Sequence, residues 1–312
     1  MRIAGTSYTD SLVSQLNFLS AQQFQLQSQI SSGQRIQKPE DDPAGMATVL
    51  NLQAQTTNIQ QYAQNISTLQ TTAGNAYNTL QQLKTISDRV GEIATLANGT
   101  KTPTELQAYA TEVNQLIQQA VNLANTKDGS RYLFSGTKSD TPPFASTVDA
   151  NGNVTAVTYQ GNTSVGERDI SENTTITVDV PGANTTGSGP RGLLTDSRYG
   201  ADFFNHLISL QKDLSTGNTA AIAKTDAPAL IKDEDNLIYH VTNNGLIQSR
   251  LDSAATDATN RQSSLQAALT KVAGVDVTKA ITDLSQQQSV YQAALASSSV
   301  LLQLQQSVMQ YL

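Results

Sequence analysis

The stretch that decides the fold runs from Asp42-Pro43 to Asn98-Gly99. Its middle, Ile59–Leu83, reads IQQYAQNISTLQTTAGNAYNTLQQL. Apolar or small residues recur at steps of three and four, which is the heptad spacing of one face of a long helix. Asp42 can cap the helix start with Pro43 at its first position, and Asn98-Gly99 can end it. The predicted seam is Ile59, Tyr62, Ile66, Leu69, Ala73, Ala76, Leu80, Leu83, Ser87, Val90, Ala94 and Ala97.

This predicted helix carries few charges. Between Ala44 and Leu83 there is no Asp, Glu, Lys or Arg, and the outward positions hold Gln, Asn, Thr and Ser. A helix that faces water usually carries charges there. A neutral helix can be packed on several sides by other helices because no charge must be desolvated. The plainer alternative is a polar, Gln-rich coiled coil with no further role.

Composition excludes several classes of function. The chain has 312 residues, a net charge of −7, 14% charged residues, and neither cysteine nor tryptophan. We expect about two domains from this length. A mildly acidic chain lacks the basic surface that is typical of nucleic-acid-binding proteins. A chain without cysteine has no disulfide bonds and no thiol chemistry. No run of about 18 apolar residues is present, so we expect no membrane insertion. The polar residues after Met1 predict no cleaved signal peptide.

Both ends of the chain predict amphipathic helices with little charge. Residues 1–11 show no period, and we expect them to be flexible. No charged residue lies between Asp10 and Arg35 or after Asp283. We expect these ends to order only when many copies assemble, because one short pair buries too little apolar surface to offset its ordering entropy. The candidate assembly residues are Leu12, Leu16, Leu19, Leu26, Ile30, Ile281, Leu284, Tyr291, Leu295, Leu302, Met309 and Leu312.

A third helix starts at Thr102-Pro103-Thr104-Glu105, which is a capping box with proline at the first helical position. The short connection from Asn98 predicts that it runs antiparallel to the long helix. Its predicted seam is Leu106, Tyr109, Val113, Leu116, Ala120 and Leu123.

Residues 131–192 predict β-structure, with a hairpin turn at Asn151-Gly152 and a loop over 181–192. Helical patterns return at 201–214, at 236–241 and at 246–272, with loops expected between them. The fold class is therefore mainly α with a β insertion: an elongated antiparallel helical bundle from paired N- and C-terminal segments, plus an outer mainly-β domain. The predicted domains are 1–42 (helix and elbow), 43–130 (helical hairpin), 131–235 (outer variable domain), 236–274 (return helix) and 275–312 (C-terminal helix).

The sequence predicts no catalytic, cofactor or metal site. His206 and His240 are the only histidines, and we interpret them as packing or surface residues. Glu40, Asp41 and Asp42 are adjacent, so their side chains diverge, and Asp42 is already needed as a cap. Asp149 begins a segment similar to a calcium loop, but its glycine comes one place early.

The terminal segments resemble the flagellin family. Ile30–Ile36 and Lys38–Gly45 are similar to its amino-terminal signature, and Ala280–Ser285 with Tyr291–Leu295 to its carboxy-terminal one. Two further segments resemble the branch of the family that joins hook to filament. They are Tyr132–Thr137 with Thr141–Phe144, and the ending Met309–Leu312.

The resemblance implies a secreted structural protein of the bacterial flagellum, not an enzyme, that forms a ring or short helical layer with copies of itself. It implies another hook-associated protein on the hook side, flagellin on the filament side, and an export chaperone. Two alternatives stay open: a minor flagellin that builds filament directly, and a secreted adhesin that binds through its β block.

Overall fold

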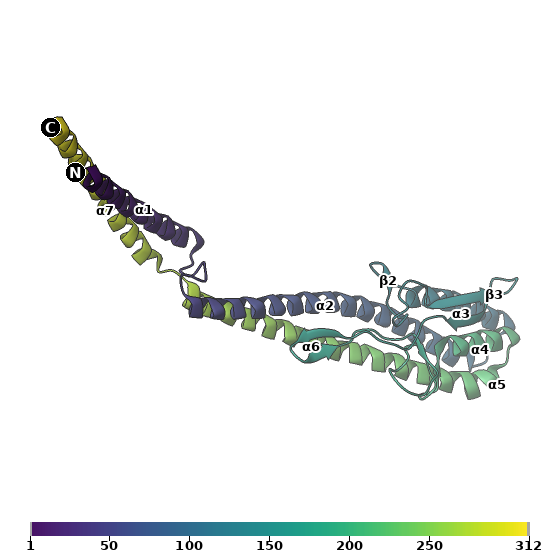
Figure 1. Cartoon of the computed structure of the whole chain (residues 1–312). Coiled ribbons are helices and arrows are strands. Elements are labelled where there is room, and N and C mark those ends of the chain that lie inside the picture. Colours follow the sequence, from purple (N-terminus) through teal and green to yellow (C-terminus); the bar gives the residue numbers. More distant parts are fainter. Residues whose placement is uncertain (1, 311–312) are drawn as a thin grey trace. The chain divides into compact units, whose positions relative to one another are not determined.

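The computed structural model describes residues 2–310, with side chains from Asp10 to Val300 and at Gln303 and Leu304. The chain divides into two compact units. The terminal unit comprises Met1–Ile59 and Asn260–Leu312, and the central unit comprises Gln60–Thr259. The predicted class, mainly α with a β insertion, is confirmed (Figure 1).

The terminal unit is built around two helices that lie side by side, α1 (Arg2–Ser32) and α7 (Val277–Gln310) (Figure 1). Helix α1 begins at Arg2 and so includes most of residues 1–11, where the sequence shows no apolar period. No proline or glycine pair interrupts this polar segment.

Residues 33–42 form an elbow that connects α1 to α2 (Pro43–Ala97). The Gly45 amide donates to Asp42 Oδ1 at 2.9 Å, which confirms Asp42 as the cap, and the helix ends before Asn98-Gly99 as predicted. Ile36 is buried with Val49 and Ala273 in a small apolar cluster. The Arg35 amide donates to the Ala273 carbonyl at 2.6 Å, and this joins the elbow to the end of α6.

The central unit holds the main core. Here α2, α3 (Pro103–Ala124), α4 (Phe203–Thr216) and α6 (Ala227–Ala273) contribute buried residues to one cluster. Contacts from Gln70 to Asp252 and from Lys84 to Glu234 place α6 antiparallel to α2. The predicted capping box of α3 is present, with Thr102 and Glu105 bonded reciprocally.

The predicted seam of α2 is buried in the central unit at every position from Ile66 to Ala97, while Tyr62 is half-buried. On α3, Leu106, Val113 and Ala120 are buried as expected. Tyr109, Leu116 and Leu123 are only half-buried; Ala110, Ile117 and Ala124 are buried in their place. Because α4 packs on α3, the buried face of α3 is shifted by one residue from the predicted seam.

The β region consists of small separate sheets. Antiparallel pairs join β1 to β2, β3 to β4 and β5 to β6, and β8 lies between β7 (parallel) and β9 (antiparallel). Gly152 has φ 81° in the turn between β3 and β4, so the predicted hairpin is confirmed. The strands are β1 Lys127–Asp128, β2 Arg131–Tyr132, β3 Phe144–Val148, β4 Val154–Tyr159, β5 Arg168–Ser171, β6 Thr174–Ile176, β7 Ala183–Asn184, β8 Thr195–Asp196 and β9 Ala201–Asp202.

One sequence expectation differs from the structure after β9. The return helix is not broken: after α5 (Thr219–Ala221) and a π-helical turn η1 (Ile222–Asp226), α6 runs through Asn244-Gly245 without a stop. Asn244 is buried and its Oδ1 accepts a hydrogen bond from Gln248, so the core holds this polar residue inside the helix. Helix α4 begins at Phe203, close to the start of the helical pattern that the sequence predicts at 201–214.

Candidate assembly interface

The candidate interface lies on the α1–α7 pair of the terminal unit. The five predicted residues of α1 are half-buried in this pair: Leu12, Leu16, Leu19, Leu26 and Ile30. A heptad stripe on α7 is buried or half-buried beside them, and it comprises Ala280, Leu284, Gln287, Tyr291, Ala294 and Ser298. A single pair therefore covers each seam only partly.

The predicted α7 residues fall into two sets. Leu284 and Tyr291 belong to the stripe within the pair. Ile281 and Leu295 are 52% and 44% exposed, on a different face of the helix. The Leu302 and Met309 side chains and the whole of Leu312 lie outside the described residues. The spacing predicts one apolar seam on α7, whereas the helix has two apolar faces.

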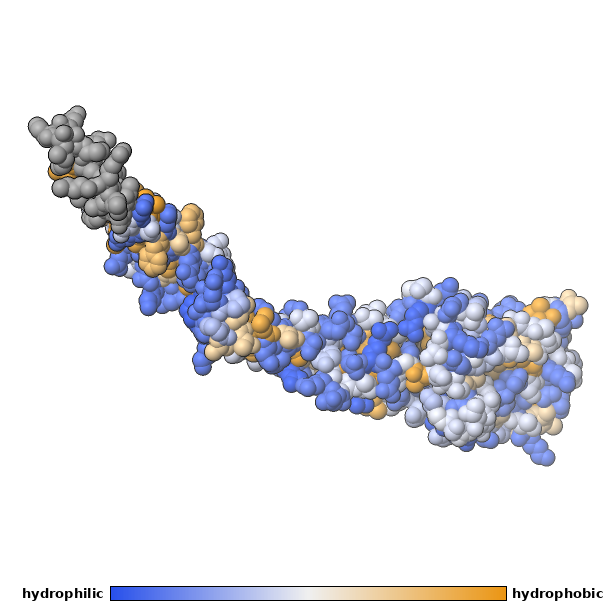
Figure 2. Space-filling model, viewed as in Figure 1, coloured by the Kyte–Doolittle hydropathy of each residue, from blue (hydrophilic) through white to orange (hydrophobic). Residues whose placement is uncertain are grey.

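Further large apolar side chains of this pair are exposed, and the sequence prediction missed them because they break the heptad seam. Phe24 on α1 is 68% exposed, and Figure 2 shows apolar residues on the surface of this unit. Contiguous exposed apolar surface is typical of interaction sites. The additional residues are Val13, Phe18, Phe24, Val277, Val290 and Val300.

A polar layer interrupts the apolar contact between α1 and α7. Gln287 Nε2 donates to Gln22 Oε1 at 2.6 Å, and Gln23 Nε2 donates to the Gln287 carbonyl at 3.2 Å. These amides join the two helices at one level along the pair, where the α1 seam lacks an apolar residue.

The elbow beside the pair is fixed by carboxylates. Asp41 accepts hydrogen bonds from the Gln37 and Lys38 amides, each at 2.9 Å, and these bonds hold its pKa below the ordinary value. The amide of Gly45 likewise lowers the pKa of Asp42. Arg35 Nη2 lies 3.4 Å from Asp42 Oδ2 and donates to the Val272 carbonyl. Asp41 and Asp42 thus bind backbone amides of the elbow, and Asp42 is the predicted cap.

The pKa values of the two histidines in the central unit are shifted in opposite directions. His206 Nδ1 lies 2.7 Å from Asp233 Oδ2, and this contact raises the pKa of His206. His240 is buried, its Nε2–H donates to the Gly192 carbonyl at 3.0 Å, and burial lowers its pKa to about 4. Asp226 is buried beside α4, where Ser209 donates to one carboxyl oxygen, and burial raises its pKa.

Within residues 2–310, no helix has the length and apolar character to cross a bilayer. No three potential metal-ligating side chains converge in that same part of the chain.

Both end regions of the chain match models of known protein families. The model of the bacterial flagellin N-terminal helical region matches residues 4–139, and that of the C-terminal helical region matches residues 237–312. Together they span about two thirds of the chain. This chain belongs to the flagellin family. Members of the family are structural proteins of the bacterial flagellum.

Individual relatives fall in two branches of the flagellin family. Flagellar hook-associated protein 3 of Escherichia coli is 38% identical over 122 residues, and that of Salmonella typhimurium is 33% identical over 165 residues. These matches span 38% and 51% of both partners, so the chain matches at most about half the length of these relatives. A Bacillus subtilis flagellin is 26% identical over 297 residues, 91% of this chain and 90% of that protein.

The flagellin-family fold agrees with a solved structure. The structure of a putative flagellar hook-associated protein from Vibrio parahaemolyticus superposes with a TM-score of 0.63 over 75% of this chain and 100% of that one. At 19% sequence identity this likeness concerns the fold alone.

Proposed function

We propose that this chain is a structural protein of the flagellum that forms a layer between the hook side and the flagellin filament. The observation that carries the proposal is the α1–α7 pair, whose seam is only half-buried and whose outer faces expose large apolar side chains. Neighbouring pairs would bury these faces without desolvating charge, because α1 from Ser11 to Ser32 and α7 after Asp283 carry none.

The proposed partners follow from this surface. Copies of the chain form a ring or short helical layer through head-to-tail contacts, which are open and can continue along an axis. A second hook-associated protein meets one face of the layer and flagellin meets the other, after chaperone-assisted export to the cell exterior. The similarity to hook-associated protein 3 of two bacteria supports the junction role.

The proposed domains keep the boundaries expected from the sequence for the terminal segments, 1–42 and 275–312, as the assembly core. Residues 43–130 and 236–274 form the supporting bundle, and 131–235 form the outward variable domain. Figure 1 locates these segments by colour along the chain.

Deletion of the gene in the native bacterium tests the proposal. A junction protein predicts cells without filaments that release flagellin into the medium. Restoration by the full chain expressed in trans is the control. Short or weakened filaments with retained motility would contradict the junction role.

A minor flagellin is the second candidate, because the Bacillus subtilis flagellin aligns over 91% of this chain. Immunogold labelling of intact flagella separates the two roles. Label confined to one short zone beside the hook supports the junction protein, and label along the filament supports the flagellin. Normal filaments in the deletion strain with lost surface attachment would instead indicate an adhesin.

A further inference from the structure

Three asparagines of the chain are each followed by a glycine, and they lie in three different settings. Asn98-Gly99 lies in the connection between α2 and α3, Asn151-Gly152 in the turn between β3 and β4, and Asn244-Gly245 inside α6. An asparagine before glycine can react with the next backbone amide, because glycine has no side chain to obstruct the close approach. The three pairs therefore share one local chemistry, and the structure decides which of them can use it.

The pair inside α6 is held most firmly. Asn244 is 2% exposed, and its Oδ1 accepts a hydrogen bond from Gln248 Nε2 at 2.6 Å. The amide of Gly245 lies in the middle of the helix and is bonded within it. Several helical residues must unwind together before this amide can reach the Asn244 side chain.

The pair in the hairpin turn is exposed, but hydrogen bonds fix its backbone. The Gly152 amide donates to the Asp149 carbonyl at 3.1 Å. Asp149 Oδ1 also accepts from the amides of Asn151 and Asn153, at 2.8 and 2.9 Å. The amide that would react is therefore already bonded, and the turn must open before it is free.

The pair after α2 has neither form of protection. Asn98 and Gly99 are both exposed and follow the last residue of the helix. The Gly99 nitrogen lies 3.4 Å from the Leu96 carbonyl oxygen, which is longer than the usual range of about 2.7–3.2 Å for such a hydrogen bond. The Asn98 side chain has no hydrogen-bond partner among the described residues.

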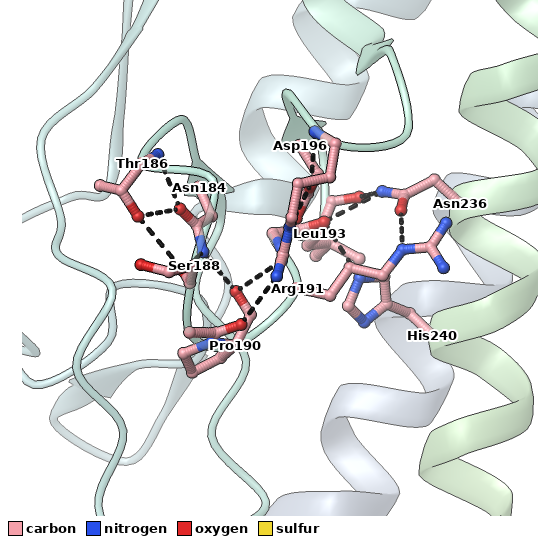
Figure 3. A network of polar contacts seen from close by, with 12 residues as sticks. Asn184, Thr186, Ser188, Pro190, Arg191, Leu193, Asp196, Asn236 and His240 are labelled. Carbon is pink, nitrogen blue, oxygen red and sulfur yellow. Dashed lines mark hydrogen bonds and ion pairs between the residues drawn. The ribbon is translucent and has the colours of Figure 1, made fainter.

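A buried asparagine of the same unit shows how the fold can immobilise such a side chain (Figure 3). Asn236 Nδ2 donates to the Gly192 and Leu193 carbonyls at 3.0 and 2.6 Å, and its Oδ1 accepts from Arg191 Nε at 2.6 Å. Polar groups that are bonded on every side are rigid. No such bonds hold the amide of Asn98 in the described part of the chain, so it can rotate toward the next backbone nitrogen.

We propose that Asn98 is a modification site, where the side chain loses ammonia spontaneously and becomes aspartate or isoaspartate. The Gly99 nitrogen gives up its proton and attacks Asn98 Cγ. A bond between that nitrogen and Cγ forms, the bond from Cγ to Nδ2 breaks, and Nδ2 leaves with the proton as ammonia. Water then opens the cyclic imide: addition at Cγ gives aspartate, and addition at the main-chain carbonyl carbon gives isoaspartate. Water is the only co-reactant, and the reaction requires no part of the assembly role.

Either product places a negative charge at the C-terminal end of α2. This helix has no basic residue in its last turn, so nothing on it offsets the repulsion between the new carboxylate and the free helix carbonyls. Isoaspartate also lengthens the main chain by a methylene directly after Ala97, which is fully buried in the core. The modification should therefore loosen the end of α2.

The experiment follows all three pairs in one sample. The purified full chain is kept folded at mildly alkaline pH and digested with trypsin at intervals, and mass spectrometry separates the asparagine, aspartate and isoaspartate forms. The three pairs lie on different tryptic peptides. Asn98 should convert faster than Asn151, and about tenfold or more faster than Asn244, because Asn244 reacts only when α6 opens locally. In urea, where the fold is lost, the three rates should become similar.

Gly99→Ala is the matched variant. Its Cβ would meet only the Leu96 carbonyl oxygen, at the ordinary contact distance of 3.6 Å, and Gly99 does not adopt a positive φ, so the fold tolerates the change. Conversion of Asn98 should slow about tenfold, because a side chain at position 99 obstructs the approach of its nitrogen, while Asn151 should be unaffected. Hydrogen exchange over residues 94–100 should be faster in the aged parent than in the fresh one, and unchanged in aged Gly99→Ala.

Three outcomes would overturn these expectations. Conversion of Asn98 no faster than that of Asn244 in the folded chain would show that Asn98 is not a favoured site, and so would an unchanged rate in Gly99→Ala. The same order of rates in urea would show that sequence, not structure, sets it. Conversion of Asn98 without faster exchange at residues 94–100 would refute the loosening of α2. All measurements use the purified chain, so failure of the assembly role would leave them unaffected.

Discussion

The seam of α2 in the central unit and the seam of the α1–α7 pair follow the same heptad spacing but reach different burial. Leu80, Leu83 and Val90 are fully buried, whereas Leu16 and Leu284 are half-buried. In the central unit α3, α4 and α6 contribute to the same core, so α2 is covered on more than one side. Heptad spacing therefore predicts that a face will be buried, and the number of neighbouring helices decides how far.

The largest effect should come from a charge on the exposed face of α7. Ile281→Asp would place a carboxylate where we propose that a neighbouring copy packs, and burying it unpaired costs several kcal/mol per copy. We expect export to continue and filament attachment to fail, as seen by motility and by electron microscopy. Thr282→Asp, beside the native Asp283, is the matched control. Normal swimming of the Ile281→Asp strain would show that this face is not an assembly surface.

The next effect compares the two seams directly. Leu80→Ala in the central unit should lower the free energy of unfolding by about 2–5 kcal/mol, because it leaves a cavity in a close-packed core. Leu19→Ala should cost roughly half of that or less, since Leu19 is only half-buried in the pair. Urea unfolding followed by circular dichroism measures both, with the exposed Leu246→Ala as control. Equal losses for Leu80→Ala and Leu19→Ala would contradict the difference in burial.

Acid should destabilise the central unit through His240. Its folded pKa of about 4 lies below the unfolded value of about 6.5, so the unfolded state takes up the proton first. The contribution of His240 is complete above pH 6.5 and is lost as the pH falls to 4, on the order of 3 kcal/mol. Unfolding measured between pH 4.5 and 7.5 should show this loss, and His240→Gln should reduce it. A His240→Gln variant that stays as acid-sensitive as the parent would refute the role of His240.

His206 should act with the opposite sign. Its pKa is raised by Asp233, so its contribution is complete below about pH 6.5 and is lost as the pH rises through the raised folded value. His206→Gln should therefore weaken the unit most below pH 6.5, by about 1–2 kcal/mol for a charge-assisted bond. A loss that is constant from pH 5 to 9 would point to packing instead of the ion pair.

The smallest expected effect concerns a helix start. Thr102→Ala removes the capping box of α3 and should cost about 1 kcal/mol, because the Glu105 amide loses its side-chain acceptor. Thr104→Ala in the same turn is the control and should change the unfolding free energy by a few tenths. If the two variants are equal, the box contributes nothing beyond propensity.

The parts of the fold that the sequence predicts are those set by neighbouring residues. Asp42-Pro43, Thr102-Pro103-Thr104-Glu105 and Asn151-Gly152 each fix a helix start or turn through contacts within a few positions. The structural roles of residues with long-range partners cannot be predicted from their sequence neighbours. Asn244 resembles a helix stop but is buried inside α6, and Arg191 lies in a predicted loop yet meets Asn236, 45 positions away.

The candidate site shows the same limit. Spacing identifies that α1 and α7 carry apolar seams, and Leu12–Ile30 and Leu284–Tyr291 take part in the pair. Spacing alone does not tell the face used within one chain from the face left for a neighbour. Spacing therefore groups Ile281 and Leu295 with Leu284, although their side chains are exposed on a different face of α7.

The glutamine layer of the α1–α7 pair has a consequence for how the two ends find each other. Leucine side chains tolerate a slide of one helix along the other by seven residues, since each then meets a similar residue. The amide of Gln287 meets Gln22 in the pair, and a slide by seven residues would bring it to Gln15 or Gln29, which also carry side-chain amides. The layer therefore disfavours the intermediate offsets that would leave the Gln287 amide against hydrocarbon, while offsets of one whole heptad keep an amide partner.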